Sequence, residues 1–319
     1  MCQSAETFST GTLPIENRSP YLNIFSFSRP DFEVQTPNNE LIWRPRLEVI
    51  NFISSTRKSK DFSLIDGETW IASNTIQYQL NENIQVDLTI PWISHGGGIS
   101  DRFIYQFHNV FQLPQNGRTK DGNDDMRWLL HSNNEVLIDQ NTSIRGVGDI
   151  SAKVSWTTPR FANTKFSGKL KLPTGSLDKF TGSEEFDFGI SVLQYNPPWF
   201  ESRNFWSETV LSLWYGLGYS VIGKTKLYDE FKTKLGTFTA RIGAGWMTMP
   251  GWQIKMQLDS NSPLFETKIR ELGWYPIQFS IGSSHKLGHA SSLDLVIVED
   301  LRPRSAPDVI FSIGFNHRI

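Results

Sequence analysis

Segment after segment of this chain alternates apolar and polar residues, the period of two that gives a β-strand two different faces. The clearest of these segments begin near Phe166, Phe238 and Trp252. The noisier segments begin near Leu41, Thr69, Ile84, Asp149, Phe186, Trp206, Pro276, Ser291 and Asp308. The chain is therefore predicted to be all-β and antiparallel, with about twelve strands.

Two features separate a barrel in a membrane from a soluble β-sandwich, which alternation alone cannot do. Short connections, such as those at Asn81–Asn83 and Pro250-Gly251, take turns with long ones, as they do in outer-membrane barrels. Ten of the 11 tryptophans also lie at or near segment ends, where aromatic girdles belong. They are Trp43, Trp70, Trp92, Trp156, Trp199, Trp206, Trp214, Trp246, Trp252 and Trp274. A soluble β-sandwich, the alternative, needs neither feature.

Full charges stand on the polar faces of these segments. The candidates for charges in the lumen are Lys153, Lys165, Lys169, Lys171, Arg241 and Lys255. An Arg or Lys near the middle of a lipid-facing surface costs roughly 2 to 4 kcal/mol, so turning four of them outward would cost on the order of 10 kcal/mol. That cost is comparable to the stability of a whole domain. The polar faces are therefore predicted to line the lumen and the apolar faces to contact lipid.

A basic wall is expected inside the barrel, because four of these lysines belong to neighbouring segments joined by a short turn: Lys153, Lys165, Lys169 and Lys171. Two interpretations remain open. In the first, the cations pair with Glu48, Asp87, Asp187 and Asp259 and fill a closed barrel. In the second, they form a constriction that favours anions.

The final residues, VIFSIGFNHRI, look like the closing strand and assembly signal of bacterial outer-membrane barrels. Such signals most often end in Phe, and this one ends in Ile319. The barrel-assembly machinery is therefore an expected partner during biogenesis. Counting back twelve strands from a periplasmic C-terminus puts the long connections outside the cell. The same count predicts that residues 1–40 form a periplasmic or luminal segment and that residues 41–319 form the barrel.

Composition excludes several other classes of protein. The 31 Lys and Arg nearly cancel the 33 Asp and Glu, so no basic field favours a nucleic-acid partner. The mean hydropathy is -0.34, and no apolar run approaches the roughly 18 residues of a membrane helix. The single cysteine, Cys2, excludes an internal disulfide and a cysteine metal cluster. No signal peptide is visible, so we expect it to have been removed.

The longest interruption of the strand pattern spans residues 92–148. Glycines lead into a short amphipathic helical pattern that begins after Ser100 and stops at Leu113-Pro114. We interpret this helix, in a long external loop, as a lid or plug; alternatively it caps the barrel or lies on the membrane surface. The lid or plug candidates are Ser94, His95, Gly96, Gly97, Gly98, Asp101, Phe103, Ile104, Phe107, His108 and Phe111.

The same stretch holds the residue types of a hydrolase triad, namely Ser94, His95, Asp101 and His108. A triad is defined by its geometry, however, and not by proximity in sequence. Asp101 and His108 are two helical turns apart, about 10 Å along the axis, which is too far for a direct hydrogen bond. Hydrogen bonds from the histidines to loop backbone or to lumen carboxylates are the preferred interpretation, and no catalytic residue is assigned.

Two further patterns resemble metal sites. His285 and His289 have the spacing of a helical zinc pair, but they lie in a predicted turn between strands. A polar run offers oxygen ligands for Ca²⁺ at Asp121, Asn123, Asp124 and Asp125, without the bidentate Glu that such a loop needs. We therefore predict neither a metal site nor a cofactor.

Several stretches together resemble one family of bacterial outer-membrane barrels, called domain of unknown function 3187. The matching stretches are NRSP from Asn17, IPWISHGGGISDRFIYQFHNVFQLP from Ile90, GVGDISAKVSW from Gly146, KLPTG from Lys171, GSEEFDFG from Gly182, QLDSNSP from Gln257, EDL from Glu299 and APD from Ala306. The resemblance covers nearly the whole chain and implies a fold and a location, but no substrate. Gly148-Asp149 and KLPTG also look like barrels implicated in the uptake of hydrophobic or aromatic compounds.

The sequence thus predicts a barrel in the outer membrane of a Gram-negative bacterium, in contact with membrane lipid and lipopolysaccharide. Our first hypothesis for its function is a passive, porin-like channel for a small hydrophobic or anionic solute, gated by residues 92–148. The second is a structural or interaction barrel that binds lipopolysaccharide or an envelope partner without transport. The third is a lipid-active hydrolase. The first is preferred because a barrel of twelve strands has a narrow lumen that a loop can occlude.

Overall fold

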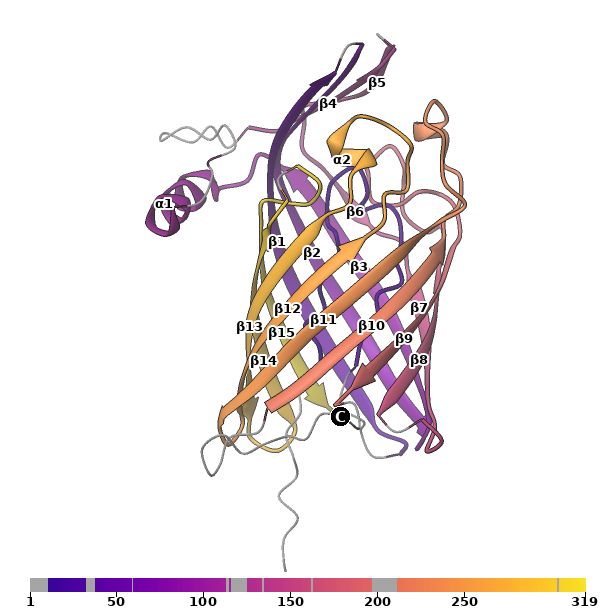
Figure 1. Ribbon diagram of the computed structural model, residues 1–319, viewed down its shortest axis with the longest axis vertical. Helices are drawn as coiled ribbons and strands as arrows, with labels where there is room; N and C mark the ends of the chain where they lie inside the picture. The colour runs from indigo at the N-terminus through magenta and orange to yellow at the C-terminus, as the bar shows by residue number, and fades with distance from the viewer. Residues whose placement is uncertain are drawn as a thin grey trace, which may run out of the picture.

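A computed structural model of the chain describes residues 11–32, 38–58, 60–112, 115, 125–133, 135–161, 163–196, 211–302 and 304–319. Figure 1 shows a tall barrel of tilted strands, with loops and short strands gathered at one end. The barrel strands are β1 (Leu41–Lys58), β2 (Asp61–Asn81), β3 (Ile84–Gly96), β7 (Ser151–Thr157), β8 (Thr164–Lys171), β9 (Asp187–Tyr195), β10 (Leu211–Val221), β11 (Gly236–Met249), β12 (Trp252–Asn261), β13 (Ile277–Leu287), β14 (Ser291–Asp300) and β15 (Val309–Arg318).

Pairing between neighbouring strands closes the barrel. The neighbours pair antiparallel, and the first strand, β1, pairs with the last strand, β15. The sheet contains fifteen strands, of which three lie outside the ring, so twelve form the barrel. The predicted antiparallel barrel of about twelve strands is confirmed. Closure matters because every barrel strand then has a hydrogen-bonding neighbour on both sides. In hydrocarbon, unpaired backbone groups would find no other partner.

The two faces of the barrel strands have opposite character. On β13, Ile281 is 41% exposed whereas its neighbour Ser280 is fully buried. On β12, Met256 is 50% exposed and Gln257 is buried. Apolar side chains outside and polar ones inside would be unfavourable in water and are required in lipid. The chain is therefore an outer-membrane barrel, with its polar faces turned to the lumen as the sequence predicts.

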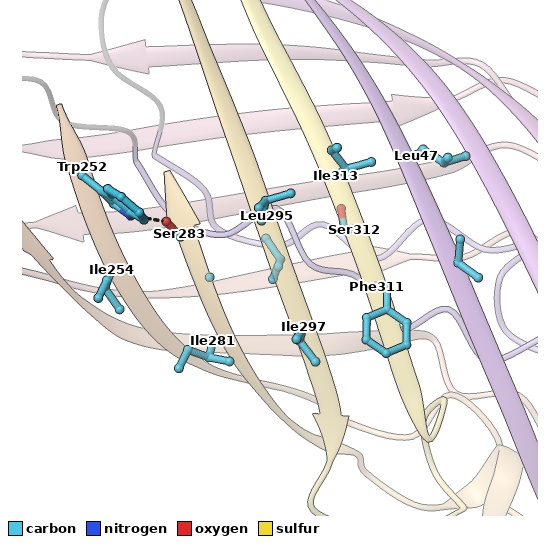
Figure 2. A pocket seen from close by; sticks show the side chains of 13 residues that line it. Leu47, Trp252, Ile254, Ile281, Ser283, Leu295, Ile297, Phe311, Ser312 and Ile313 are labelled. Atoms are coloured by element: carbon cyan, nitrogen blue, oxygen red, sulfur yellow. Dashed lines mark hydrogen bonds between the residues drawn. The ribbon is translucent and has the colours of Figure 1, made fainter. Parts of the chain in front are cut away.

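The outer wall carries one shallow apolar depression of about 530 Å³, formed by β1 and β12 to β15. Figure 2 shows its lining, in which Ile281, Leu295 and Ile313 alternate with residues that face the lumen. At one side the Trp252 indole donates a hydrogen bond to the Ser283 hydroxyl, 2.5 Å away. This lone polar pair is thereby satisfied, so the depression belongs to the lipid-facing surface.

The tryptophans occupy mostly the predicted girdle positions. Six of them are exposed on the outer face: Trp43, Trp92, Trp156, Trp246 and Trp252 lie toward strand ends, whereas Trp70 lies at the middle of β2. Trp274 lies in an external connection, and Trp199 and Trp206 fall outside the described residues. The prediction is wrong for Trp214, which is fully buried and donates to the Gln257 side chain in the lumen. Trp214 lies on the inward face of β10, together with Ser212 and Gly216.

The long connections gather at one end of the barrel, which is the external end by the rule for outer-membrane barrels. They contain the helices α1 (Asp101–Phe111), η1 (Lys226–Tyr228) and α2 (Arg270–Gly273), and the strands β4 (Arg127–Ser132), β5 (Glu135–Gln140) and β6 (Ile144–Val147). In the part of the chain that the structure describes, no helix is long and apolar enough to cross a membrane.

The external end differs from the sequence prediction in two respects. The first connection is short, because β1 and β2 continue beyond the rim and pair as far as Lys58 and Asp61. The interruption predicted at 92–148 also holds three strands that alternation did not indicate. One of them, β6, pairs with the upper part of β3, and the β4–β5 hairpin extends β2. Outside the membrane no lipid-facing side is needed, so the period of two weakens there.

Gly67 is the point at which β2 changes partners. Below it β2 pairs with β3 from Glu68 onward, and above it with β4 from Asp66. The glycine has φ of 142°, and a Cβ there would lie 2.8 Å from the Gly96 backbone oxygen. A side chain would therefore meet both strain and a clash, so Gly67 permits the branch.

Helix α1 confirms the single short helix predicted in the long external loop, and it lies beside the barrel wall (Figure 1). Ile104 is fully buried, and the Phe103 ring packs edge-on against Phe311 on the outer face of β15. The Asn51 amide of β1 donates to the Asp101 carboxylate at 3.1 Å and fixes the start of the helix. As described, α1 is outside the lumen, so a lid or plug role would require it to move.

The lipid-facing surface yields the first prediction. We expect Leu295→Arg, on the outer face of β14, to destabilise the barrel by roughly 2 to 4 kcal/mol, because the guanidinium would lie in hydrocarbon. The free energy of unfolding would be measured by urea titration in phosphatidylcholine vesicles, with tryptophan fluorescence as the signal.

Leu301→Arg is the matched control, since Leu301 is exposed in the external connection after β14. Equal losses of stability in the two variants would contradict the assignment of the outer face to lipid.

Candidate functional site

The lumen of the barrel is occupied by residues 11–32, which we call the luminal segment (Figure 1). Its two ends meet, because the Thr12 amide donates to the Phe32 carbonyl at 2.8 Å. Its middle forms a turn in which the Asn23 amide donates to the Ser19 carbonyl. The segment therefore doubles back, with its turn toward the external end, where the Tyr228 hydroxyl of the β10–β11 connection donates to the Tyr21 carbonyl.

Arg241 of β11 holds both legs of the luminal segment. Its guanidinium donates to the Ile15 carbonyl on one leg and to the Pro30 carbonyl on the other, each at 2.9 Å. A third hydrogen bond reaches the Thr12 hydroxyl at 3.4 Å. Asp259 of β12 accepts from the guanidinium Nε at 2.7 Å and supplies its counter-charge. One planar, buried cation thus joins wall and segment with the fixed geometry that arginine allows.

Charged side chains of the luminal segment also pair with charges on the wall. The pairs are Arg18 with Glu48 (2.7 Å), Glu16 with Lys169 (3.1 Å), Arg29 with Asp259 (3.4 Å) and Asp31 with Lys153 and with Lys165 (4.0 Å). Most of these groups are largely buried. Buried ion pairs add little net stability, but removal of one partner leaves an uncompensated charge at considerable cost. The segment and the wall are therefore matched in charge.

Glycines on the wall make room for the returning leg of the segment. A Cβ at Gly218 of β10 would lie 2.0 Å from the Ser28 carbonyl oxygen, and a Cβ at Gly189 of β9 would lie 2.3 Å from the Ser28 Cβ. Around this contact the Thr239 hydroxyl donates to the Ser28 carbonyl, and the Ser28 amide donates to the Ser220 hydroxyl, both at 2.6 Å. A side chain at either glycine would displace the segment, so the wall is shaped to receive it.

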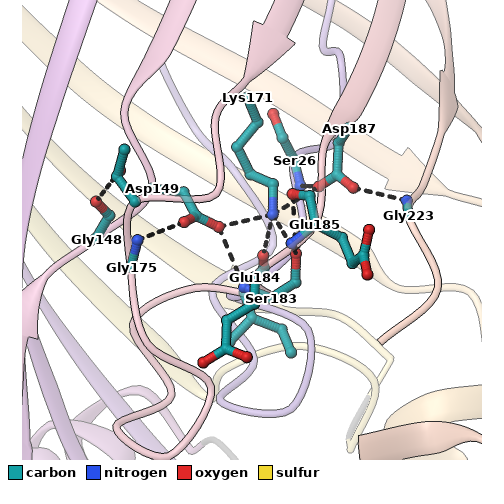
Figure 3. Close-up of polar contacts among 12 residues, drawn as sticks. Ser26, Gly148, Asp149, Lys171, Gly175, Ser183, Glu184, Glu185, Asp187 and Gly223 are labelled. Carbon is teal, nitrogen blue, oxygen red and sulfur yellow. Dashed lines mark hydrogen bonds and ion pairs between the residues drawn. The ribbon is translucent and has the colours of Figure 1, made fainter. Parts of the chain in front are cut away.

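Lys171, near the external end of β8, links the luminal segment to three connections (Figure 3). Its ammonium lies 2.7 Å from the Asp149 carboxylate and 3.2 Å from the Asp187 carboxylate. It also donates to the Ile24 carbonyl of the segment at 2.9 Å, and to the Ser183 hydroxyl. All of its donors are thereby used on acceptors from different parts of the chain.

The two carboxylates around Lys171 in turn hold the backbone of the connections and the segment. Asp149 accepts from the amides of Gly175, at 2.7 Å, and Ser183. Asp187 accepts from the amides of Ser26, at 2.8 Å, and Gly223, at 2.9 Å. Figure 3 shows these contacts converging from the β8–β9 and β10–β11 connections. The external connections and the segment are thus fastened by one polar network.

An apolar cluster closes the external end above this network. The luminal segment contributes Tyr21, Leu22, Ile24, Phe25 and Phe27. The upper strands and connections contribute Phe52, Ile65, Met126, Trp128, Leu130, Ile138, Phe180, Ile222, Tyr228, Phe231, Leu264, Phe265, Ile269 and Leu272. The Tyr228 and Phe265 rings lie 5.0 Å apart, a distance typical of packed aromatic pairs. Apolar contacts thus hold the turn of the segment, whereas polar contacts and a smaller apolar cluster around Leu13 and Ile15 hold the rest of it in the lumen.

Glu271 of α2 is buried beside this cluster. The Ser54 and Thr56 hydroxyls of β1 donate to the same carboxylate oxygen, at 2.5 and 3.0 Å. Burial raises the pKa of Glu271, and the two hydroxyl hydrogen bonds only partly offset this rise. Burial therefore favours the neutral form of this carboxyl more in the folded protein than in the unfolded chain.

The six predicted lumen charges all lie on the inner face of the barrel. Lys153, Lys165 and Lys169 face Asp31 and Glu16, Lys171 faces two acids, and Arg241 faces Asp259. Lys255 is also buried on the inward phase of β12. Lys153 opposes Lys169 directly between β7 and β8, and both belong to the expected basic wall. The acids proposed from sequence include Asp87, which lies 2.8 Å from Lys153.

The proposed triad residues are not brought together in the part of the chain that the structure describes. Ser94 and His95 are consecutive in β3 and point to opposite faces. His95 is buried, bonds the Thr69 hydroxyl and the Phe180 carbonyl oxygen, and packs edge-on against Trp128. The Asp101 carboxylate instead accepts a hydrogen bond from the Asn51 side-chain amide of β1. The side chains of Phe107, His108 and Phe111 lie outside the described residues.

The glycines and the metal-like patterns have structural surroundings. Gly96 ends β3, and Gly98 has φ of 81° where a Cβ would meet the Glu68 side chain at 2.4 Å. His285 packs against the Trp252 ring, and His289 follows in a turn. Asp121, Asn123 and Asp124 lie outside the described residues. Among the residues that are described, no group of three or more His, Cys, Asp and Glu has a metal-binding arrangement.

The motifs behind the family resemblance meet at the luminal segment. NRSP supplies Arg18, GVGD supplies Asp149, KLPTG supplies Lys171, GSEEFDFG supplies Asp187, and QLDSNSP supplies Asp259. In addition, Gln257 binds both the amide and the carbonyl of Leu13, and the Asn17 amide donates to the Ser305 carbonyl. Stretches scattered along the sequence therefore form one site, the seat of the luminal segment.

Comparison with known proteins agrees with this architecture. The model of the family described as "Protein of unknown function (DUF3187)" matches residues 1–319, so the chain belongs to this family. None of the curated proteins matches the chain. Among solved structures, an outer membrane channel from Pseudomonas putida F1 is similar over 89% of this chain and 97% of that chain, with 11% sequence identity and a TM-score of 0.53. This likeness shows a shared barrel fold.

Two other solved structures have lower scores. The KdgM porin is similar over 86% of this chain and 98% of that chain, with 10% identity and a TM-score of 0.42. The CymD monoaromatic hydrocarbon channel is similar over 98% of this chain and 95% of that chain, with 8% identity and a TM-score of 0.40.

The Lys171 network yields the second prediction. We expect Lys171→Met to lower the free energy of unfolding by roughly 3 to 5 kcal/mol, because Asp149 and Asp187 would lose the buried cation that lies between them. Urea unfolding in vesicles would measure the loss. Lys232→Met, which breaks the exposed pair with Glu266, is the control and should have no measurable effect. A similar, small effect of both variants would argue against a role for the network in stability.

Glu271 yields the third prediction, on pH. Because its folded pKa is raised, the neutral carboxyl stabilises the fold fully below the unfolded pKa, and this contribution is lost as pH rises through the folded pKa. Glu271→Gln keeps the acceptor and cannot ionise. The difference in free energy of unfolding between the variant and the wild type should therefore shift in favour of the variant as the pH rises above the unfolded pKa of about 4. A difference that stays constant as the pH rises would contradict the raised pKa.

Proposed function

We propose that this member of the DUF3187 family is a passive outer-membrane channel for a small hydrophobic or anionic solute, and that the luminal segment is its gate. The observation that carries the proposal is the nature of the segment's seat. Inside the barrel the segment is held by many hydrogen bonds and ion pairs to the wall, beside a smaller apolar cluster around Leu13 and Ile15. Such a wall can be hydrated when the segment leaves.

The polar wall supports a channel over a merely structural barrel. A barrel that only had to be stable would gain from an apolar filling, since buried ion pairs are often no better than apolar side chains of similar volume. Here the inward positions are instead occupied by residues such as Gln77, Gln85, Ser167 and Gln257. Polar lining is the general property of barrels that let solutes pass.

The gate is assigned to the luminal segment and not to residues 92–148. Helix α1 of that region lies beside the wall, whereas the segment lies in the path of any solute. Both ends of the segment lie toward the periplasmic end, where Phe32 stacks on Tyr195 at the end of β9. The segment can therefore withdraw as a loop, once Arg241 and the polar network release it.

The two solute classes correspond to two parts of the site. The external apolar cluster, with Phe25, Tyr228, Phe231 and Phe265, is buried and would offer a binding surface for a hydrophobic solute once its packing opens. The basic wall on β7 and β8 offers attraction to an anionic solute. An anion would meet the wall only after the segment withdraws.

One observation favours the alternative of an interaction barrel. Ile99, Phe103 and Val110 are 76%, 57% and 75% exposed on and next to α1, although they are apolar. Phe103 adjoins the lipid-facing Phe311, and the three side chains would suit lipopolysaccharide acyl chains or an envelope partner. A lipid-active hydrolase has less support, since Ser94 and His95 point to opposite faces. Ile319, exposed at the end of β15, would be available to the barrel-assembly machinery.

Liposome swelling tests the channel proposal. Arg241→Gln removes the donors that hold Thr12, Ile15 and Pro30, so we expect vesicles that contain this variant to swell severalfold faster in small sugars than vesicles with the wild type. Heat-modifiable migration in gels would show that the barrel is folded.

Lys232→Gln, at an exposed position of the β10–β11 connection, is the matched control for the loss of one cation. No swelling with Arg241→Gln, or with Arg18→Gln plus Arg241→Gln, in folded protein would refute the channel and leave the interaction barrel as the better account.

A further inference from the structure

The cations of the lumen differ in the source of their counter-charges. Arg241 and Lys171 are paired with acids of the wall and its connections, at Asp259, Asp149 and Asp187. Lys165 and Lys169 are different. Within the described parts of the chain, their ion pairs are made only with the luminal segment, at Asp31 and Glu16. Withdrawal of the segment would leave these two lysines without acidic partners.

Lys165 is incompletely satisfied even while the segment is in place. The residue is only 3% exposed, and its ammonium makes no hydrogen bond to any described residue. Among the described residues the nearest acid oxygen, on Asp31, is 4.0 Å away, beyond hydrogen-bond distance. A buried ammonium with unused donors is costly, and an anionic ligand that accepted hydrogen bonds from it would remove this cost.

These lysines lie close together on the wall. Lys153 and Lys169 are direct partners across β7 and β8, and Lys165 pairs with Thr157 further toward the periplasmic end of the same two strands. Lys153 already has a wall acid, Asp87, but also binds Asp31. The segment thus places two carboxylates, those of Glu16 and Asp31, against three ammonium groups.

We propose that Lys153, Lys165 and Lys169 form a binding site for small organic carboxylates, which Glu16 and Asp31 of the luminal segment occupy in the closed state. This inference rests on the proposed channel function and specifies which class of anionic solute the channel would bind. The chemistry is the same for occupant and solute, because an ionised carboxylate accepts the charge-assisted hydrogen bonds that an ammonium donates. The segment is therefore a competitive occupant of the solute site.

The charge changes on withdrawal support this role. The segment carries Arg18 and Arg29 as well as its two acids, so its removal changes the sum of charges little. It changes their distribution, because both acids leave the β7–β8 wall, whereas the arginines leave acids elsewhere, on β1 and β12. The β7–β8 side becomes basic, and such a surface concentrates anions in a narrow lumen.

Competition for one site couples the solute to the gate. A carboxylate that binds the lysines only when the segment is out favours the open state, and by linkage the segment weakens solute binding by the same factor. Full-length protein in planar bilayers with a potassium acetate gradient tests this coupling. We expect Glu16→Gln plus Asp31→Asn to raise the current and to shift the reversal potential toward that of acetate.

Removal of the site should abolish the preference. Adding Lys165→Gln and Lys169→Gln to that variant is expected to keep the current and to lose the shift toward acetate. Lys232→Gln is the matched control outside the lumen and should keep the shift. A folded Glu16→Gln plus Asp31→Asn variant that remains closed, or that opens without anion preference, overturns the inference. Faster swelling with Arg241→Gln would in either case leave the channel function standing.

A second measurement follows the segment itself. Ser26 is buried, and its hydroxyl makes no hydrogen bond to a described residue, so Ser26→Cys in a Cys2→Ser background is a mild change. We expect potassium acetate to speed the reaction of this thiol with a neutral maleimide more than potassium chloride of equal concentration does. The difference should vanish with Lys165→Gln plus Lys169→Gln. Equal rates in the two salts with the lysines intact would overturn the inference.

Discussion

Charges that face the inside of a narrow barrel must be compensated within it, and this constraint governs the rest of the structure. They cannot turn outward, because hydrocarbon covers the other face of each strand. The wall compensates part of its charge itself, as in the pair of Arg241 with Asp259. The remainder is compensated by the luminal segment, through Glu16, Arg18 and Asp31. The segment is thus an electrostatic part of the barrel although it belongs to no strand.

The barrel could be predicted from the sequence, because the membrane imposes a period of two on every strand that crosses it. Mid-strand residues such as Arg241 and Lys255 then settle which face is inside, since the cost of the opposite choice exceeds what a fold can bear. The alternation of apolar and polar residues is lost where the strands leave the membrane. In the upper parts of β1 and β2 and in the β4–β5 hairpin, apolar and polar residues do not alternate regularly, so the sequence does not predict these strands.

The seat of the luminal segment could be predicted only in part. Sequence placed the lysines in the lumen, but it could not show that Asp31 and Glu16, more than a hundred residues away, are their partners. Local rules do not report such distant pairs. Trp214 illustrates the same limit, since its position near a strand end indicated a girdle, whereas only the phase of β10 shows that it points inward. The available signal was the cluster of charges flanking the apolar block Tyr21–Phe27.

The doubled-back course of the luminal segment has a consequence for biogenesis. The segment precedes β1 in the chain, and the ring is completed only when β15, the last strand, pairs with β1. Because both ends of residues 11–32 lie toward the same end of the barrel, this described segment is a loop and does not thread through the ring. A loop of this kind can enter the lumen before or after the seam closes, and it can leave again without reopening the sheet.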